Sequence, residues 1–245
     1  YSGSGGLDIG LSNTGAIEIV GCVEWDSDAC ETLRRSVDKG ITTVIEADIK
    51  ELDVPDVLES IGRSSEEIDL IVGGPPCQAF SVFGKRRGLD DPRGNVILDF
   101  VRFVEEIHPK AFVMENVRGL LSMKHEGEKG GIYHLLIDAF NRLGYRVDVF
   151  VVNSVNYGAP QIRERVIFIG NRLQLVADFP EPTHSDKPMG DQQRFATLGD
   201  AIKGKKFRDQ GIMDFSPRKK GYLEMIPEGG NWRSMPEEIQ KESMG

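Results

Sequence analysis

Short apolar runs alternate with amphipathic segments along the first 170 residues of the chain. The apolar runs predict strands at 17–23, 43–46, 68–72 and 111–114. Apolar residues at helical spacing predict helices at 28–37, 54–61, 95–107 and 132–143. Two further apolar runs, 145–152 and 165–170, predict a closing pair of strands. This alternation of β and α units predicts an α/β fold with a doubly wound, mostly parallel sheet and helices on both faces.

The pattern changes after Gly170. Prolines interrupt the chain at positions 180, 182, 188 and 217, charges alternate, and the apolar periodicity fades. We therefore expect one domain over residues 1–170, followed over 171–245 by part of a smaller, irregular domain.

Composition and charge limit the partners of this chain. The formal net charge of −9 disfavours DNA, because affinity for a duplex rests mostly on neutralising phosphates. Basic clusters at 85–87, 203–208 and 218–220 weaken this objection. The three cysteines show no CxxC spacing, so we expect neither a disulfide framework nor a metal site. No apolar run approaches the roughly 18 residues that span a bilayer, which predicts a soluble cytoplasmic protein without a membrane partner.

The strand predicted at 68–72 runs directly into Gly73-Gly74-Pro75-Pro76-Cys77. Ligands of open α/β sheets bind beyond the carboxyl ends of the strands, where this loop begins. The two prolines fix φ and lack an N–H donor, so they end the strand and present Cys77 from a stiff loop. A lone cysteine is more often a buried structural residue, so its interpretation depends on the surrounding motifs.

A glycine turn opens the chain. Gly3, Gly5 and Gly6 allow a tight turn whose N–H groups can face a carboxylate, although such turns also occur as plain loops. Glu24, about twenty residues further on, suits a carboxylate that binds two ribose hydroxyls. Only Tyr1 precedes the turn, and we expect a few apolar residues before Tyr1 to form the central strand of the sheet.

Five motifs, in this order and spacing, resemble those of the C5-cytosine DNA methyltransferases. They are Ser2 to Asp8, Val23 to Asp26, the loop from Gly74 to Asn95, Glu115-Asn116-Val117 and Gln161 to Arg165. The resemblance covers about residues 1–170. It implies a Rossmann-like methyltransferase sheet, S-adenosylmethionine as cofactor and S-adenosylhomocysteine as product, with no metal.

The resemblance also assigns roles to individual residues. A cofactor site would contain Tyr1, Ser2, Gly3, Gly5, Gly6, Glu24, Trp25, Asp48, Ile49, Gly74 and Val96. Catalysis would use Cys77, Glu115, Arg163 and Arg165. A substrate loop would contact DNA through Gln78, Ser81, Lys85, Arg86, Arg87 and Arg93.

The chemistry explains these residue types. Cytosine C5 is too electron-poor to attack a sulfonium methyl group unaided, so a Cys77 thiolate first adds to C6. Glu115, at the end of the strand over 111–114, can stabilise the charge that develops at N3. Arg163 and Arg165 alternate along an extended segment, so their guanidinium groups share a side and suit the base and nearby phosphates. Without this resemblance, Glu115 would be interpreted as a solvated charge or as part of a surface salt bridge. The two arginines would be interpreted as part of an exposed row of charges across neighbouring strands.

We therefore expect a methyltransferase that modifies cytosine C5 in double-stranded DNA, flips its target base and belongs to a restriction-modification system in the cytoplasm of a bacterium. Two alternatives stay open, an RNA C5-cytosine methyltransferase and a non-catalytic regulatory subunit. A silent subunit should have a damaged Cys77, Glu115 or Arg165, and all three are present. The family's two closing motifs are not found, so residues 171–245 would hold only the start of the target-recognition region. Either a longer chain or a second polypeptide would supply the rest.

Overall fold

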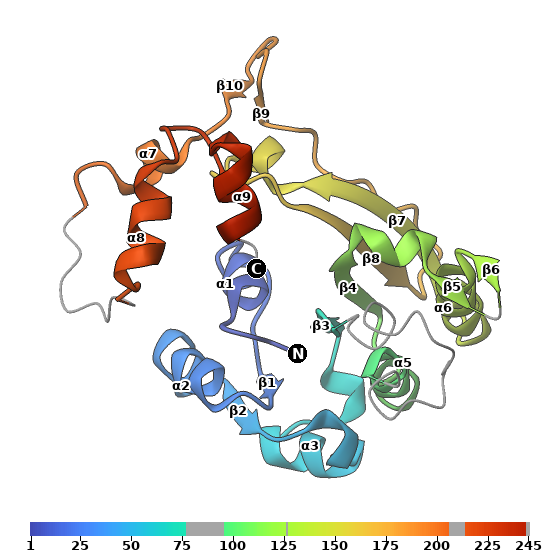
Figure 1. Ribbon diagram of the computed structural model, residues 1–245. Helices are drawn as coiled ribbons and strands as arrows, with labels where there is room; N and C mark the ends of the chain where they lie inside the picture. Colours follow the sequence, from blue (N-terminus) through green and yellow to red (C-terminus); the bar gives the residue numbers. More distant parts are fainter. Residues whose placement is uncertain (77–95, 126, 206–213, 244–245) are drawn as a thin grey trace. The chain divides into compact units, whose positions relative to one another are not determined.

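The computed structural model describes residues 1–76, 96–125, 127–205 and 214–243 (Figure 1). Contacts divide the chain into two units, Tyr1–Ala201 and Ile202–Gly245. The first unit thus contains the predicted domain over 1–170 together with part of the irregular region. The second unit contains α8 (Pro217–Glu224) and α9 (Glu237–Ser243).

The first unit is an α/β structure, as the sequence predicts. Its main helices are α1 (Gly6–Ser12), α2 (Ser27–Ser36), α3 (Val54–Ile61), α5 (Val96–Ile107) and α6 (Gly131–Arg142). Its main strands are β1 (Gly21–Glu24), β2 (Thr43–Glu46), β3 (Leu70–Gly73), β4 (Ala111–Val117), β7 (Arg146–Asn153) and β8 (Glu164–Asn171). Two short strand pairs and one helix complete the unit. The pairs are β5 (Lys124–His125) with β6 (Glu128–Lys129) and β9 (His184–Ser185) with β10 (Gln193–Arg194). The helix is α7 (Leu198–Ile202), at the boundary between the units.

The main sheet is mixed rather than mostly parallel. Its strand order is β3-β4-β8-β7, with β3 and β4 parallel and the other two pairs antiparallel. Strands β1 and β2 form a separate parallel pair. The antiparallel half arises because a short connection joins β7 to β8, and only antiparallel neighbours can be joined in this way. The predicted α/β class and closing strand pair are confirmed.

Strand β4 is longer than its apolar run predicts. It continues to Val117, because β8 pairs with it as far as Arg165. Along β4 the side chains of Phe112, Met114 and Asn116 are buried on one face, while Glu115 lies on the opposite face. Glu115 is therefore held inside a paired strand rather than at a free strand end.

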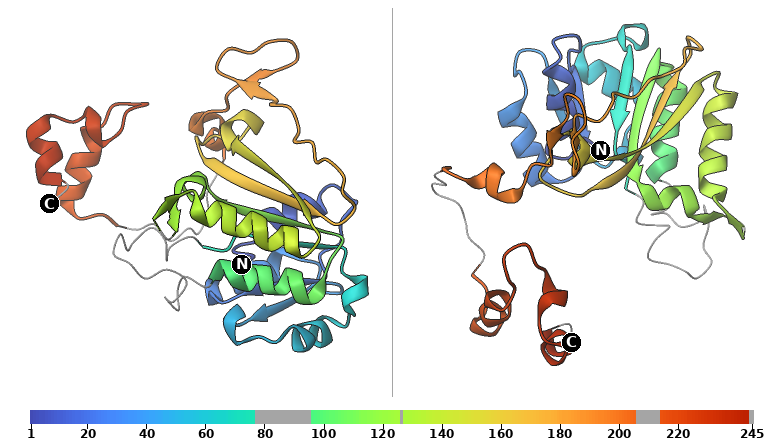
Figure 2. Two further views of the ribbon diagram at one scale, coloured as in Figure 1. Left: turned by 90° about the vertical axis from the view of Figure 1, so that its right-hand side faces the viewer. Right: turned by 90° about the horizontal axis from the view of Figure 1, so that it is seen from above.

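Helices α5 and α6 lie together on one face of the main sheet (Figure 2). Their buried side chains, such as Phe100 and Phe140, pack on Phe112 and Phe168 of the sheet. The rings of Phe112 and Phe140 lie 4.1 Å apart between centroids. Burying each such side chain contributes roughly 1.5–3 kcal/mol, so this cluster fixes β4 and α5 relative to each other.

A cavity of about 780 Å³ lies between β1 and β3. It is lined mainly by apolar residues of the two strands, of α3 and of α5. Within the described ranges, β1 and β3 share no strand pairing.

Candidate active site

Strands β4 and β8 bring a carboxylate and a guanidinium group together. Arg165 lies opposite Val117 in the strand register, which places it diagonal to Glu115 on the same face of the sheet. Its Nε donates to Oε1 of Glu115 over 2.7 Å. Both side chains stay partly open to solvent, with exposed fractions of 20% and 34%. Two residues that the sequence assigns to catalysis are thus in direct contact.

Arg163 lies one residue before β8 and is exposed. Its backbone N–H donates to Oδ1 of Asn153 over 3.0 Å, and its carbonyl accepts from the N–H of Ser154 over 3.1 Å. Between the two arginines, Glu164 pairs with Arg118 through contacts of 2.9 and 3.0 Å. The backbone at Arg163 is therefore fixed beside the Glu115 and Arg165 pair.

The loop that leads to Cys77 is anchored to β4. Pro75 is buried, and its carbonyl accepts from Nδ2 of Asn116 over 2.8 Å. Asn116 is only 3% exposed, and its Oδ1 accepts from the N–H of Val117. Asn116 lies within the Glu115-Asn116-Val117 motif, but the sequence alone predicts no role for it. The alternation of the strand places Asn116 on the same buried face as Phe112 and Met114. A polar residue at such a position was the signal in the sequence that it has a structural role.

Gly74 lies against the carboxylate of Glu115. A Cβ atom built on Gly74 would stand 3.2 Å from Oε2 of Glu115, closer than side chains normally approach. A larger residue at position 74 would push this carboxylate away by a few tenths of an ångström.

Seven predicted site residues lie outside the described residues. They are Cys77, Gln78, Ser81, Lys85, Arg86, Arg87 and Arg93. The other two cysteines, Cys22 and Cys30, are buried. Burial raises the pKa of the Cys22 thiol to about 11 and also raises the pKa of Cys30. Neither thiol forms an accessible thiolate near neutral pH.

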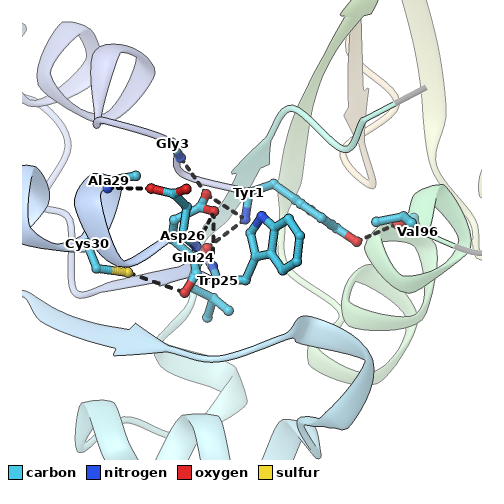
Figure 3. Close-up of polar contacts among 9 residues, drawn as sticks. Tyr1, Gly3, Glu24, Trp25, Asp26, Ala29, Cys30 and Val96 are labelled. Carbon is cyan, nitrogen blue, oxygen red and sulfur yellow. Dashed lines mark hydrogen bonds and ion pairs between the residues drawn. The ribbon is translucent and has the colours of Figure 1, made fainter. Parts of the chain in front are cut away.

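The glycine turn and Glu24 form a second cluster (Figure 3). Oε2 of Glu24 accepts from the N–H of Gly3 over 2.8 Å, and Oε1 accepts from the N–H groups of Trp25 and Asp26 over 3.0 and 3.2 Å. Glu24 is only 7% exposed to solvent. A carboxylate has about four acceptor positions, so three are used by the backbone. Two ribose hydroxyls would need two acceptor positions on Glu24, and only about one is open. One hydroxyl would therefore have to share an acceptor position with a backbone N–H group.

The glycine turn has the conformation that its sequence predicts. Gly3 and Gly5 have φ values of 55° and 81°, in the left-handed region that favours glycine. A Cβ atom on Gly5 would also stand 2.8 Å from Leu33. Ser2 is half-buried and Gly6 is exposed at the start of α1. Beside this turn the Trp25 side chain is 74% exposed, which leaves its ring open to a planar ligand.

The remaining predicted cofactor residues lie around α5. Asp48 caps the short helix η1 (Ile49–Glu51) by accepting from the N–H of Lys50. Ile49 is 9% exposed and packs in the core with Phe103. Val96 begins α5, and its carbonyl accepts from the Tyr1 hydroxyl over 2.9 Å.

In the described part of the chain, no cluster of three or more His, Cys, Asp or Glu side chains could hold a metal ion. Among the described helices, none is long and apolar enough to cross a membrane.

The fold is α/β, with a glycine turn and a buried carboxylate at β1 and a glutamate–arginine pair on the paired strands β4 and β8. This combination is typical of a methyltransferase of the α/β type. The sequence model of the C-5 cytosine-specific DNA methylases matches residues 1–225. The chain belongs to this family.

Curated relatives are type II methyltransferases. The chain is 40% identical over 221 residues to M.AquIA of Picosynechococcus sp., a match that covers 89% of this chain and 87% of that protein. It is 36% identical to M.NgoFVII of Neisseria gonorrhoeae over 97% of this chain, but spans only 61% of that relative. It spans 53% of M.Sau96I of Staphylococcus aureus at 35% identity.

Solved structures show the same fold. A candidate DNA modification methyltransferase from an Escherichia coli prophage superposes with a TM-score of 0.64 at 26% identity, over 95% of this chain and 65% of that one. The methyltransferase EhMeth of Entamoeba histolytica gives a TM-score of 0.65 at 15% identity, over 93% of this chain and 65% of that one.

Proposed function

We propose that this chain transfers a methyl group from S-adenosylmethionine to C5 of a flipped-out cytosine in double-stranded DNA, through a covalent bond between Cys77 and C6. The observation that carries the proposal is the contact of Glu115 with Arg165 beside Gly74 and Pro75, two residues before Cys77. It supplies a carboxyl group and a cation close to the point where the described chain ends at Pro76, directly before Cys77 in the sequence.

The reaction begins with the Cys77 thiolate, which forms an S–C6 bond as the electrons of the C5=C6 double bond move towards the N3 side of the ring. Glu115 donates a proton or hydrogen bond to N3 and so stabilises this charge. Arg165 offers its remaining N–H groups to the cytosine O2 while it holds Glu115 in place. The resulting enamine makes C5 nucleophilic.

When held by the glycine turn and Glu24, S-adenosylmethionine would supply the electrophilic methyl group that C5 attacks. N3 then returns its proton to Glu115. A base removes the C5 proton, and the electron pair of the C5–H bond restores the C5=C6 bond as the S–C6 bond breaks. Cys77 leaves as the thiolate, so atoms and electrons balance over the cycle. S-adenosylhomocysteine and 5-methylcytosine are the products.

The residues present fit an adenosine cofactor. Glu24 retains about one open acceptor position, and the exposed Trp25 ring provides a surface for stacking on a base. We propose that the turn at Ser2 to Gly6, with Tyr1, Glu24, Trp25, Asp48, Gly74 and Val96, holds the cofactor, and that Ile49 takes part mainly through its backbone.

We assign DNA contacts to the loop residues Gln78, Ser81, Lys85, Arg86, Arg87 and Arg93, together with Arg163. A second polypeptide that completes target recognition is the proposed protein partner.

Mass spectrometry of nucleosides tests the proposal. The chain, with or without its partner, is expressed in cells without cytosine methylation, and 5-methylcytosine is measured in DNA and RNA. We expect a signal in DNA that Cys77→Ser abolishes and that Cys22→Ala, which changes a buried thiol, retains. A signal confined to RNA would favour an RNA methyltransferase, and no signal with the partner present would favour a silent subunit.

A DNA duplex that contains 5-fluorocytosine tests the covalent step. Fluorine replaces the proton that must leave C5, so the S–C6 adduct cannot break down. We expect a protein–DNA band that survives denaturation for the unaltered chain and for Cys22→Ala, but not for Cys77→Ser. A surviving band with Cys77→Ser would contradict the assigned nucleophile.

A further inference from the structure

Tyr1 contacts both sides of the segment that separates β3 from α5. Its hydroxyl donates to the carbonyl of Val96, the first residue of α5, over 2.9 Å (Figure 3). Its carbonyl lies 3.5 Å from the N–H of Gly74, which follows β3 directly. A single residue therefore touches the chain before and after that segment.

The backbone of Tyr1 is also tied to the glycine turn and to β1. Its amino group and the N–H of Ser2 both donate to the carbonyl of Val23, over 2.6 and 3.3 Å. Two residues later, Gly3 donates to Glu24. Tyr1 is thus held at the point where the turn, β1 and β3 meet.

The Tyr1 side chain can restrict the motion of α5 when the glycine turn is fixed. An aromatic side chain has two torsion angles and keeps few alternative positions once its ring is packed. The Tyr1 ring packs against the cluster formed by α3 and α5. Burial, with added repulsion from Asp99, raises the pKa of its hydroxyl, so the hydroxyl stays a proton donor.

A second contact ties the same helix to the predicted adenine side. Arg102, in the second turn of α5, donates to the carbonyls of Ile49 and Leu52 over 2.9 and 3.1 Å. Helix α5 therefore holds η1 through Arg102 and the glycine turn through Tyr1.

We propose that Tyr1 is a positioning residue whose hydroxyl couples ligand binding at the glycine turn to the first turn of α5. The proposal rests on the proposed function, since it takes the glycine turn as the cofactor site. Ordering the turn around a ligand fixes Tyr1, and Tyr1 then fixes the carbonyl of Val96. The first turn of α5, where the substrate loop ends, becomes more rigid when the ligand binds.

Tyr1→Phe isolates the hydroxyl, and Tyr145→Phe is its matched control. The Tyr145 hydroxyl donates to the carbonyl of Pro109 over 2.7 Å, just beyond the other end of α5. Both variants thus lose one tyrosine hydroxyl bond to a backbone carbonyl next to the same helix. Only Tyr1 also contacts the glycine turn.

Calorimetry with S-adenosylhomocysteine and hydrogen exchange of residues 96–103 provide the test. We expect the ligand to slow exchange in this segment in the unaltered chain and in Tyr145→Phe. In Tyr1→Phe this slowing should be lost, and the Kd for the ligand should rise about two- to tenfold, the factor expected for one neutral hydrogen bond.

Equal affinity and full slowing of exchange in Tyr1→Phe would overturn the inference while leaving the proposed function intact. The same losses in Tyr145→Phe would also overturn it, because they would show a general loosening of α5. An unaltered chain that does not bind S-adenosylhomocysteine would remove the proposed function together with the inference.

Discussion

Asn116 of β4 holds the carbonyl of Pro75, the second residue after β3, through a buried hydrogen bond of 2.8 Å. The bond joins two strands that are parallel neighbours, at the point where the chain turns towards Cys77. It fixes the direction in which the loop leaves the sheet. The site therefore depends on an amide that takes no part in the proposed chemistry.

Asn116→Asp should weaken both the fold and the reaction. An ionised aspartate cannot donate to Pro75, and leaving a buried group unsatisfied costs about 1–3 kcal/mol. Asn171→Asp is the matched control, since Nδ2 of the buried Asn171 donates to the carbonyl of Leu175 over 2.8 Å. We expect both variants to lower Tm in thermal unfolding, but only Asn116→Asp to lower kcat at a temperature where both are folded. Equal kcat values for the two variants would argue against a role of Asn116 in the site.

Gly74→Ala should impair catalysis more than stability. The added Cβ would stand 3.2 Å from Oε2 of Glu115, so the carboxylate has to move away from the position that Arg165 holds. We expect kcat to fall by about tenfold, as small misplacements of reacting groups are costly, with Tm nearly unchanged. Gly119→Ala, where nothing lies within 4 Å of the new atom, is the control and should retain full activity.

Glu115→Gln should abolish most activity without unfolding the protein. Glutamine keeps an oxygen for Arg165 but cannot give a proton to the cytosine ring, and general acid catalysis is worth about 10²–10⁴ in rate. Single-turnover methylation of a DNA duplex measures the loss. Glu164→Gln breaks only the exposed pair with Arg118 and should change the rate little. A rate for Glu115→Gln within threefold of the unaltered chain would contradict the assigned role.

Asp148 should make stability depend on pH. The N–H of Ala177, and then Arg146, hold the pKa of this carboxyl below its usual range. A depressed folded-state pKa adds stability above the unfolded pKa of about 3.9, and that stability is lost as pH falls through the folded value. Asp148→Asn should therefore lower the free energy of unfolding by about 1 kcal/mol at pH 7, with a shrinking difference below about pH 4. Denaturant unfolding at pH 7 and pH 3 checks this, and an unchanged difference would count against it.

Much of the local structure follows from the sequence alone. The helices at 54–61 and 95–107 and the strand at 43–46 lie within one residue of their predicted limits, because apolar periodicity and helix-capping residues act over a few positions. Strand limits were less predictable. The run at 17–23 became a strand only from Gly21, where pairing with Thr43 begins, and β4 continued past its apolar run because β8 pairs with it.

The sequence by itself determined the residue types of the site: the glycine turn, Glu24, the Gly-Pro-Pro-Cys loop, Glu115 and Arg165. The chemistry of each step and the order of the motifs are enough to identify these residues, because each step requires a particular residue type. Only the tertiary structure decided how they meet. The diagonal contact of Arg165 with Glu115, the Asn116 bond to Pro75 and the two contacts of Tyr1 join residues 22 to 95 positions apart. Such contacts depend on strand register and on the packing of α5 against the sheet, which no short stretch of sequence specifies.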